Sequence, residues 1–204
     1  MSENKFCSIW LSLLIIAVFI LQISIDEFTD ALILNSSAFI QIWRFLTSIF
    51  LHGSAPHLIY NLFALILFGL ILEKLIGSKN FLLVFFLSGI LANLISAFFY
   101  PSSLGASGAI YGILGTLTVL KPKMIIWAFG IPMPMFIASV LWIFADISGL
   151  FIPSNTGHIA HLSGIGIGFL LGIIFLPRTR KREKTYKISI PEIYMQNWEN
   201  RFMR

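Results

Sequence analysis

The chain is organised around the stretch Gly105-Ala106-Ser107-Gly108-Ala109-Ile110-Tyr111-Gly112-Ile113-Leu114-Gly115. This stretch opens an apolar segment, and its first turn has almost no side-chain bulk, which lets neighbouring helices approach closely. One hydroxyl group, that of Ser107, stands among the small residues, and the Tyr111 ring follows one helical turn later. A hydroxyl at a helix contact either links the helices or takes part in chemistry, and the rest of the chain must decide between the two.

The composition places most of the chain in a lipid bilayer. Of its 204 residues, 57% are hydrophobic and 11% are charged, whereas a soluble domain is nearer to ~25% charged. At about 20 residues for each crossing, six or seven spans would use up the length and leave no room for a sizeable second domain. The net charge of +5 does not indicate nucleic-acid binding, because the basic residues lie in short connections and a tail. Cys7 is the single cysteine, so an internal disulfide and a cysteine metal site are both excluded.

Six apolar segments are predicted to span the membrane, at about 6–25, 57–75, 81–99, 106–120, 133–150 and 158–176. The first lacks a clear small-residue cleavage site, so we interpret it as a retained helix and not as a signal peptide. A long semi-polar connection, 26–56, precedes the second span, and such long loops are often functional. We expect a turn at 77–80 and an interfacial connection at 124–131. Residues 1–177 then form the transmembrane domain, and 178–204 form a basic cytoplasmic tail.

The positive charges predict the orientation. With six spans both termini share one side, and a cytoplasmic tail then puts thirteen of the 14 Lys and Arg residues inside, with only Arg44 outside. A seventh span would break this pattern. The sequence therefore predicts a multi-pass protein of the cell membrane with cytoplasmic N- and C-termini.

Strongly polar side chains inside a bilayer are costly and tend to mark function, and here they gather near one surface. His57 and Asn61 are four residues apart at the start of the second span, so they share a helix face. Ser107 begins the fourth span, and His161 lies near the start of the sixth. In the predicted topology all three spans enter from the outer side. The four side chains should therefore lie at one depth, in a site that opens to the extracellular side.

Each of these residues has a structural explanation when it is considered alone. Ser107 could pack between helices, His57 could lie at the interface, Asn61 could bond a neighbouring helix, and His161 could satisfy a backbone carbonyl. Together they match serine chemistry, in which imidazole is the usual base because its pKa is about 6.5. The oxyanion needs donors, which the His57 ring, the Asn61 amide and the Ser107 N–H could supply near a helix N-terminus.

Glycines predict how the serine and the histidine meet. The sixth span carries a stripe of glycines on the face of His161, at Gly164, Gly168 and Gly172. The fourth span carries glycines close to helical spacing, at Gly108, Gly112 and Gly115. Two such flat faces can pack backbone to backbone. This packing would bring His161 within reach of Ser107.

On these residues the sequence resembles the rhomboid family of intramembrane serine proteases. The matching elements are Trp43-Arg44 and His52, His57-Leu-Ile-Tyr-Asn61, Gly105-Ala-Ser107-Gly108 with Tyr111, and Ala160-His161-Leu-Ser-Gly164 with Gly168. A G-x-S-G motif alone is weak evidence. The H-x-x-x-N, G-x-S-G and A-H-x-x-G elements, in this order on the second, fourth and sixth spans, are specific together.

The resemblance implies an all-α bundle of six transmembrane helices with a long membrane-associated loop between the first two. It also implies a Ser–His dyad, with Ser107 as the nucleophile and His161 as the general base and acid. The oxyanion hole would consist of His57, Asn61 and the Ser107 N–H, and Tyr111 would hold the His161 ring.

The resemblance also assigns roles around the site. Trp43 and Arg44 would belong to a loop lying partly in the outer leaflet, and His52 would help to structure that loop or a water pocket. The fifth span and the 151–157 loop would act as gate and cap. Family members cleave other membrane proteins within or beside a transmembrane helix, often after a small residue. The expected partners are therefore transmembrane protein substrates and the bilayer, and no metal or cofactor is expected.

Two residues compete with these assignments. Asp146, in the outer part of the fifth span, could be the third member of a triad. Because the resemblance implies a dyad, we expect Asp146 to face the loop or water instead. His158 lies three residues before His161 and could face the same side, but the A-H-x-x-G match favours His161 as the base.

Two other functions stay open at this stage. A catalytically inactive relative that guides the turnover of membrane proteins would usually lack the serine or the histidine, and this chain keeps both. A small channel or transporter would place polar groups through the full depth of the membrane. Here they gather in the outer third, where Asn93 and Ser96 of the third span also lie.

Overall fold

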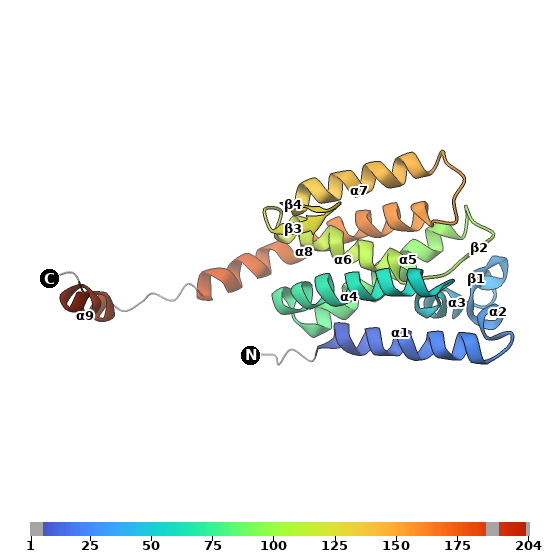
Figure 1. Ribbon diagram of the computed structural model, residues 1–204, viewed down its shortest axis with the longest axis horizontal. Helices are drawn as coiled ribbons and strands as arrows, with labels where there is room; N and C mark the ends of the chain where they lie inside the picture. The colour runs from blue at the N-terminus through green and yellow to red at the C-terminus, as the bar shows by residue number, and fades with distance from the viewer. Residues whose placement is uncertain (1–5, 187–191, 203–204) are drawn as a thin grey trace.

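The computed structural model describes residues 6–186 and 192–202, which are mostly helical (Figure 1). The helices are α1 (Cys7–Ser24), α2 (Phe28–Leu32), α3 (Arg44–Thr47), α4 (Ala55–Ile76), α5 (Ser78–Ser96), α6 (Ser107–Leu120), α7 (Met135–Gly149), α8 (His158–Tyr186) and α9 (Glu192–Phe202). Two short 3-10 helices lie at Ser36–Phe39 and Ser48–Phe50. The strands form two antiparallel ribbons, in which β1 (Leu34–Asn35) pairs with β2 (Ser102–Ser103) and β3 (Ile125–Ala128) pairs with β4 (Ile131–Pro134).

Four of the described helices are long and apolar enough to cross a membrane: α1, α4, α5 and the His158–Pro177 part of α8. The helices α6 and α7 are apolar but shorter, with 14 and 15 residues. The end where α1 begins and the end to which α8 runs lie on the same side of the bundle, at the left of Figure 1.

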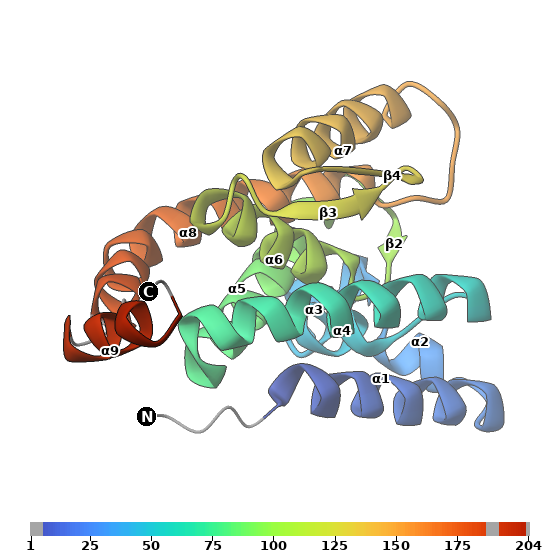
Figure 2. The ribbon, with the colours of Figure 1, turned by 60° about the vertical axis from the view of Figure 1, so that its left-hand side comes forward.

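The central helix is α6, which contacts α4, α5, α7 and α8 (Figures 1 and 2). Most of its residues are buried, including Ile113 and Leu117, whereas α7 lies at the edge and buries only Met135, Ala138, Ser139 and Asp146. Large apolar side chains such as Trp10, Phe63 and Phe144 point out of the bundle. Apolar outer faces are what a lipid environment requires.

The long connection after α1 is fixed by buried polar groups. Arg44 is 7% exposed, and its Nη1 donates to the carbonyl oxygens of Asp30 (2.7 Å) and Ile33 (2.8 Å). The Asn93 amide of α5 donates to the Phe45 carbonyl and the Ser48 hydroxyl, both at 2.9 Å. These bonds give the carbonyl oxygens of Asp30, Ile33 and Phe45 side-chain partners. They also tie the connection to the bundle, so it is an ordered part of the fold.

One local prediction is wrong, and two segments have more structure than was predicted. The turn predicted at 77–80 is made by Gly77 alone, at φ 83°, and α5 begins directly at Ser78. The connection predicted at 124–131 is the first half of the β3–β4 hairpin, whose turn residues Phe129 and Gly130 both have positive φ, as type I′ turns require. The sixth predicted span, 158–176, agrees with the apolar part of α8, His158–Pro177, and the helix itself continues to Tyr186. Lys5 and residues 187–191 of the predicted topology lie outside the described residues.

A buried carboxylate joins three helices at the end of the bundle where α1 begins. Glu73, in the last turn of α4, is 1% exposed and accepts hydrogen bonds from Cys7 N (2.9 Å), Ser8 N (3.1 Å), Ser8 Oγ (3.0 Å) and Ser78 Oγ (2.6 Å). The Cys7 and Ser8 N–H groups belong to the first turn of α1, which has no side-chain cap of its own. An acidic group at a helix N-terminus is favourable, so Glu73 serves as the cap of α1.

Glu73→Gln is expected to lower the free energy of unfolding by about 1.5–3 kcal/mol, because a neutral amide cannot accept from these donors as the carboxylate does. Thermal or denaturant unfolding in detergent measures the loss. The exposed neighbour Lys74 provides the control, since Lys74→Gln also changes one charge and should leave stability within ~0.5 kcal/mol. Equal stability of Glu73→Gln and the unchanged protein would contradict the capping role.

Candidate active site

The helices α4, α6 and α8 all begin at the end of the bundle drawn on the right of Figure 1. His57 and Asn61 lie in the first two turns of α4, Ser107 is the first residue of α6, and His161 lies in the first turn of α8. The fold therefore brings these four positions to one end of the molecule from distant parts of the chain.

Ser107 is half-buried and stands where α6 begins. As the first helical residue it has an N–H without a partner inside the helix, and Ala106 before it offers no side-chain cap. Within residues 6–186 and 192–202, the Ser107 hydroxyl makes no hydrogen bond. Both its hydroxyl and its N–H are thus available to a bound group.

Gly105 allows the His57 ring to approach Ser107. Its φ is +124°, and its N–H donates to the Ser48 carbonyl at 2.9 Å. A Cβ atom at Gly105 would lie 2.9 Å from His57 Cε1 and 4.0 Å from Ser107 Oγ. Both the backbone angle and the space therefore require glycine.

Backbone contact fixes the separation of α6 and α8, the helices that carry Ser107 and His161. A Cβ atom at Gly164 would lie 2.1 Å from the Gly108 carbonyl oxygen, and one at Gly168 would lie 2.2 Å from that of Gly112. Real atoms cannot approach this closely, so only glycine permits the contact. The predicted packing of the two glycine faces is confirmed for these pairs.

The His161 ring is held on two sides. It stacks on the Tyr111 ring with a centroid distance of 4.2 Å and an interplanar angle of 8°. Its Nδ1 lies 2.9 Å from Asp146 Oδ1. Within the part of the chain that the structure describes, His161 Nε2 has no hydrogen-bond partner. An imidazole with a fixed plane and a free second nitrogen is suited to accept a proton.

The remaining polar residues surround this pair. Asn61 is 6% exposed, and its Nδ2 donates to the His57 carbonyl at 2.8 Å, so its bond lies within α4 and one amide hydrogen stays available. Trp43 is half exposed on the α2–α4 connection, while the neighbouring Arg44 is buried and stabilises that connection. The two adjacent residues thus have different environments.

His52 lies in the connection before α4 and is 2% exposed. Its backbone N–H donates to Gln22 Oε1 at 2.9 Å, and its ring meets the His57 ring edge-on at 5.0 Å. Burial and the nearby His57 lower the pKa of His52 to about 4. His52 is therefore neutral at physiological pH and packs behind His57.

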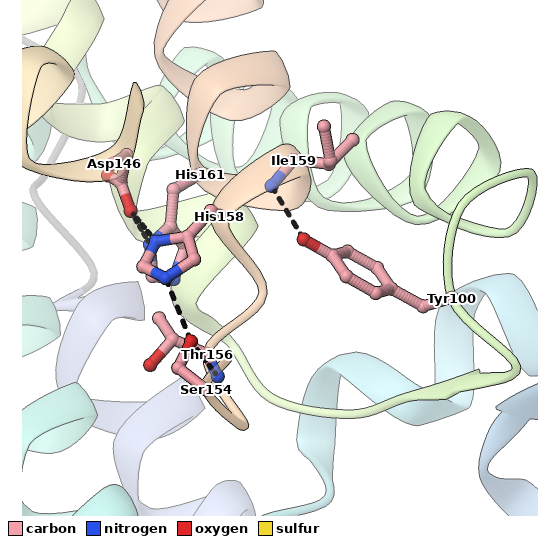
Figure 3. Close-up of polar contacts among 7 residues, drawn as sticks. All are labelled: Tyr100, Asp146, Ser154, Thr156, His158, Ile159 and His161. Atoms are coloured by element: carbon pink, nitrogen blue, oxygen red, sulfur yellow. Dashed lines mark hydrogen bonds and ion pairs between the residues drawn. The ribbon is translucent and has the colours of Figure 1, made fainter. Parts of the chain in front are cut away.

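The prediction that Asp146 faces the loop or water is wrong. Asp146 is 4% exposed and points from α7 toward α8, where its Oδ1 lies 2.7 Å from His158 Nδ1 as well as 2.9 Å from His161 Nδ1 (Figure 3). A charged group inside an apolar span needs a partner, and the two histidines provide one. An acidic residue within an apolar span is the signal in the sequence that indicates such a partner.

Two polar residues near the site were not identified from the sequence. The Tyr100 hydroxyl accepts from the Ile159 N–H at 3.1 Å and caps the first turn of α8 (Figure 3). The Ser154 hydroxyl lies 3.0 Å from His158 Nε2. A tyrosine at a span end and a serine in a loop carry no motif, so neither could have been assigned from the sequence.

Asp146, His158 and His161 could also offer three ligand atoms to a metal ion, since these atoms lie within 4.8 Å of one another. Ligands of a tetrahedral zinc ion, at ~2.0–2.1 Å from the metal, are about 3.3 Å apart. The 2.7 and 2.9 Å separations found here are shorter and match hydrogen bonds. The donors thus satisfy one another in this arrangement.

Comparison with known proteins gives a consistent result. Residues 40–178 match the model of the Rhomboid domain. The chain is 34% identical over 138 residues to RHOMBOID-like protein 4 of Arabidopsis thaliana, 34% over 146 residues to the putative rhomboid protease YdcA of Bacillus subtilis, and 31% over 141 residues to the rhomboid protease GlpG of Yersinia pseudotuberculosis. These matches cover 67%, 69% and 67% of this chain, and 34%, 70% and 49% of the three relatives. The chain thus spans about a third of the plant relative and about half of GlpG.

The low pKa of His52 predicts a pH-dependent stability. Between its ordinary pKa of 6.5 and its folded pKa of about 4, the unfolded chain binds a proton that the folded chain does not. The free energy of unfolding should therefore fall as the pH is lowered from 6.5 toward 4.

Thermal unfolding in detergent at several pH values between 7 and 4.5 checks this, with His52→Gln as the comparison. The difference between the two curves then reports the contribution of His52. The variant should lose less stability on acidification than the unchanged protein. Parallel curves for the two proteins would contradict the assignment.

Proposed function

The chain belongs to the rhomboid family, and from this premise we propose that it is an intramembrane serine endopeptidase. The family resemblance predicted from the motifs is confirmed. The proposed reaction is hydrolysis of a peptide bond within or beside a transmembrane segment of another membrane protein. The proposed partners are such substrates and the surrounding bilayer.

The observation that carries this proposal is the relation between Ser107, Tyr111 and His161. Tyr111 follows Ser107 by one turn on α6, and its ring stacks directly on His161 of α8. The glycine contact between α6 and α8 lies on the same faces. The imidazole is thus held beside the helix end at which the serine stands, which supports a nucleophile and a base acting together.

In the proposed mechanism Ser107 Oγ attacks the carbonyl carbon of the scissile bond while its proton passes to His161 Nε2. The resulting oxyanion would accept hydrogen bonds from the Ser107 N–H, the free amide hydrogen of Asn61 and the His57 ring. The tetrahedral intermediate then collapses, and His161 gives the proton to the leaving amine. A water molecule deprotonated by His161 hydrolyses the acyl-enzyme, which restores the Ser107 hydroxyl.

The length of α6 supports a position of Ser107 inside the bilayer. Its 14 residues span ~21 Å, whereas the hydrocarbon core is ~30 Å thick. If the inner end of α6 lies near the cytoplasmic surface, as Lys121 and Lys123 favour, Ser107 lies below the outer surface. We propose that α6 and α7 complete a set of six spans with cytoplasmic termini, and that water enters the site from the extracellular side.

The surroundings of the site support two further parts of the proposal. The connection between α1 and α4 exposes Phe39, Ile40, Ile42 and Trp43, which suits a loop lying partly in the outer leaflet. The peripheral α7 and the 151–157 loop would act as gate and cap, since α7 buries few of its side chains. We retain the assignment of 1–177 to the transmembrane domain and of 178–204 to a cytoplasmic tail.

Ser107→Ala is expected to abolish cleavage of a transmembrane reporter substrate and labelling by a fluorophosphonate in detergent, because both need the hydroxyl. His161→Ala should abolish cleavage through loss of the base. Ser102→Ala changes an exposed serine in the connection between α5 and α6, and it should change neither cleavage nor labelling. Cleavage by Ser107→Ala at the rate of the unchanged protein would rule out the proposed function.

Asn61→Ala is expected to slow cleavage by about 10- to 1000-fold without preventing folding, because other donors share the oxyanion. Asn80 gives a matched control, since its Nδ2 donates to the Ile76 carbonyl at 2.8 Å in the same i−4 arrangement, but at the start of α5. Equal rates in Asn61→Ala and Asn80→Ala would show that Asn61 has no role in the reaction.

A further inference from the structure

The carboxylate of Asp146 connects the peripheral α7 to the start of α8. Asp146 is one of the four buried residues of α7, and its Oδ1 faces Nδ1 of both His161 (2.9 Å) and His158 (2.7 Å) (Figure 3). Within the described residues, Asp146 Oδ2 has no hydrogen-bond partner. The hydrogen bonds of this carboxylate are therefore made through Oδ1, with the two histidines at the start of α8.

The contact with Asp146 fixes the tautomer of His161. An ionised carboxylate can only accept hydrogen bonds, so the proton of the imidazole must be on Nδ1. Nε2 then carries the lone pair, which is the form that can receive the Ser107 proton. Stacking on Tyr111 fixes the plane of the ring, and the bond to Asp146 fixes its rotation within that plane. The two contacts together leave the ring one position.

His158 holds the carboxylate and does not compete as a base. Its Nδ1 is directed at Asp146, and its Nε2 lies 3.0 Å from the Ser154 hydroxyl, so both ring nitrogens are engaged. The ring also fills the space next to Gly149, where a Cβ atom would lie 2.3 Å from His158 Cε1. His158 is thus fixed next to the end of α7 and contacts the same oxygen of Asp146 as His161 does.

We propose that Asp146 is a positioning residue for His161, so that this chain uses a Ser–His–Asp arrangement. This proposal rests on the proposed function. When the proton moves from Ser107 Oγ to His161 Nε2, the ring becomes an imidazolium. The adjacent carboxylate stabilises this positive charge and keeps the ring oriented, but it does not take the proton itself. The proton is later delivered to the leaving amine.

A purely structural role would be to tie α7 to the bundle, and the chain offers a matched control for it. Ser139 of α7 is 1% exposed, and its hydroxyl forms a hydrogen bond with Thr118 of α6. Ser139→Ala removes a buried polar link between α7 and the bundle without touching either histidine. Asp146→Asn keeps the size of the side chain but removes its charge, and its amide can impose the wrong tautomer on His161.

The experiment measures kcat and KM for a transmembrane reporter, the rate of fluorophosphonate labelling and the thermal unfolding temperature in detergent. Asp146→Asn should lower kcat and the labelling rate by about 10²- to 10⁴-fold, with KM within ~3-fold and unfolding near that of the unchanged protein. Asp146→Glu, which keeps the charge, should be at least ~10-fold faster than Asp146→Asn. Ser139→Ala should leave kcat unchanged.

Several results would overturn the proposal. Asp146→Asn with kcat near that of the unchanged protein would do so, as would an Asp146→Glu variant no faster than Asp146→Asn. If Ser139→Ala and Asp146→Asn lost kcat and thermal stability together, Asp146 would only be a structural link. Activity that EDTA removes and zinc restores would assign the cluster to a metal. Ser107→Ala distinguishes failure of the proposed function from failure of the role proposed for Asp146. If Ser107→Ala cleaves at the rate of the unchanged protein, both proposals are wrong. If Ser107→Ala is inactive and Asp146→Asn is fully active, only the role of Asp146 is wrong.

Discussion

The close contact between α6 and α8 is the constraint on which the rest of the structure depends. The carbonyl oxygens of Gly108 and Gly112 lie where side chains of Gly164 and Gly168 would otherwise stand. Between helices surrounded by lipid, association relies on van der Waals packing and interhelical hydrogen bonds, and both need short distances. Here the Thr116 hydroxyl adds such a bond to the Gly168 carbonyl at 3.0 Å. The same contact lets Tyr111 reach across to His161, so packing and the candidate chemistry share one cause.

A second constraint is that every charged group inside the bundle must be paired. Glu73 meets four donors where α1 begins, and Asp146 meets two imidazoles where α8 begins. Each carboxylate joins helices that are separate in the sequence, and each lies beside a helix start. The two groups differ in their surroundings, because Glu73 is bonded to backbone and hydroxyl donors, whereas Asp146 is bonded to side chains that can carry a proton. Of these two carboxylates, only that of Asp146 therefore lies beside groups that can transfer a proton.

The sequence predicted most of the helices and the residues that the fold brings together, because hydropathy and motif spacing are local signals. The sequence failed at residues whose structural role depends on partners that are distant in the chain. Pro132 and Pro134 lie in β4, where proline is tolerated because the strand is an edge of a hairpin, and no β ribbon was predicted there. Glu73 caps α1, and no local pattern pairs residues that are 65 positions apart. The implied dyad favoured an Asp146 that faces the loop or water. The cost of a charge within a span favours a partner instead, and Asp146 lies against two histidines.

The central claim is that the backbone contact between α6 and α8 sets the geometry of the site, and α8 contains the residues for a direct test. A Cβ atom at Gly164 would clash with the Gly108 carbonyl, whereas a Cβ atom at Gly166 would meet nothing within 4 Å. The measurement compares kcat for reporter cleavage in Gly164→Ala and Gly166→Ala, with folding checked by thermal unfolding in detergent. The account predicts a loss of at least about 100-fold in Gly164→Ala, in line with the cost of a 1 Å misplacement of catalytic groups, and normal cleavage in Gly166→Ala. A folded Gly164→Ala protein that cleaves as fast as Gly166→Ala would contradict it.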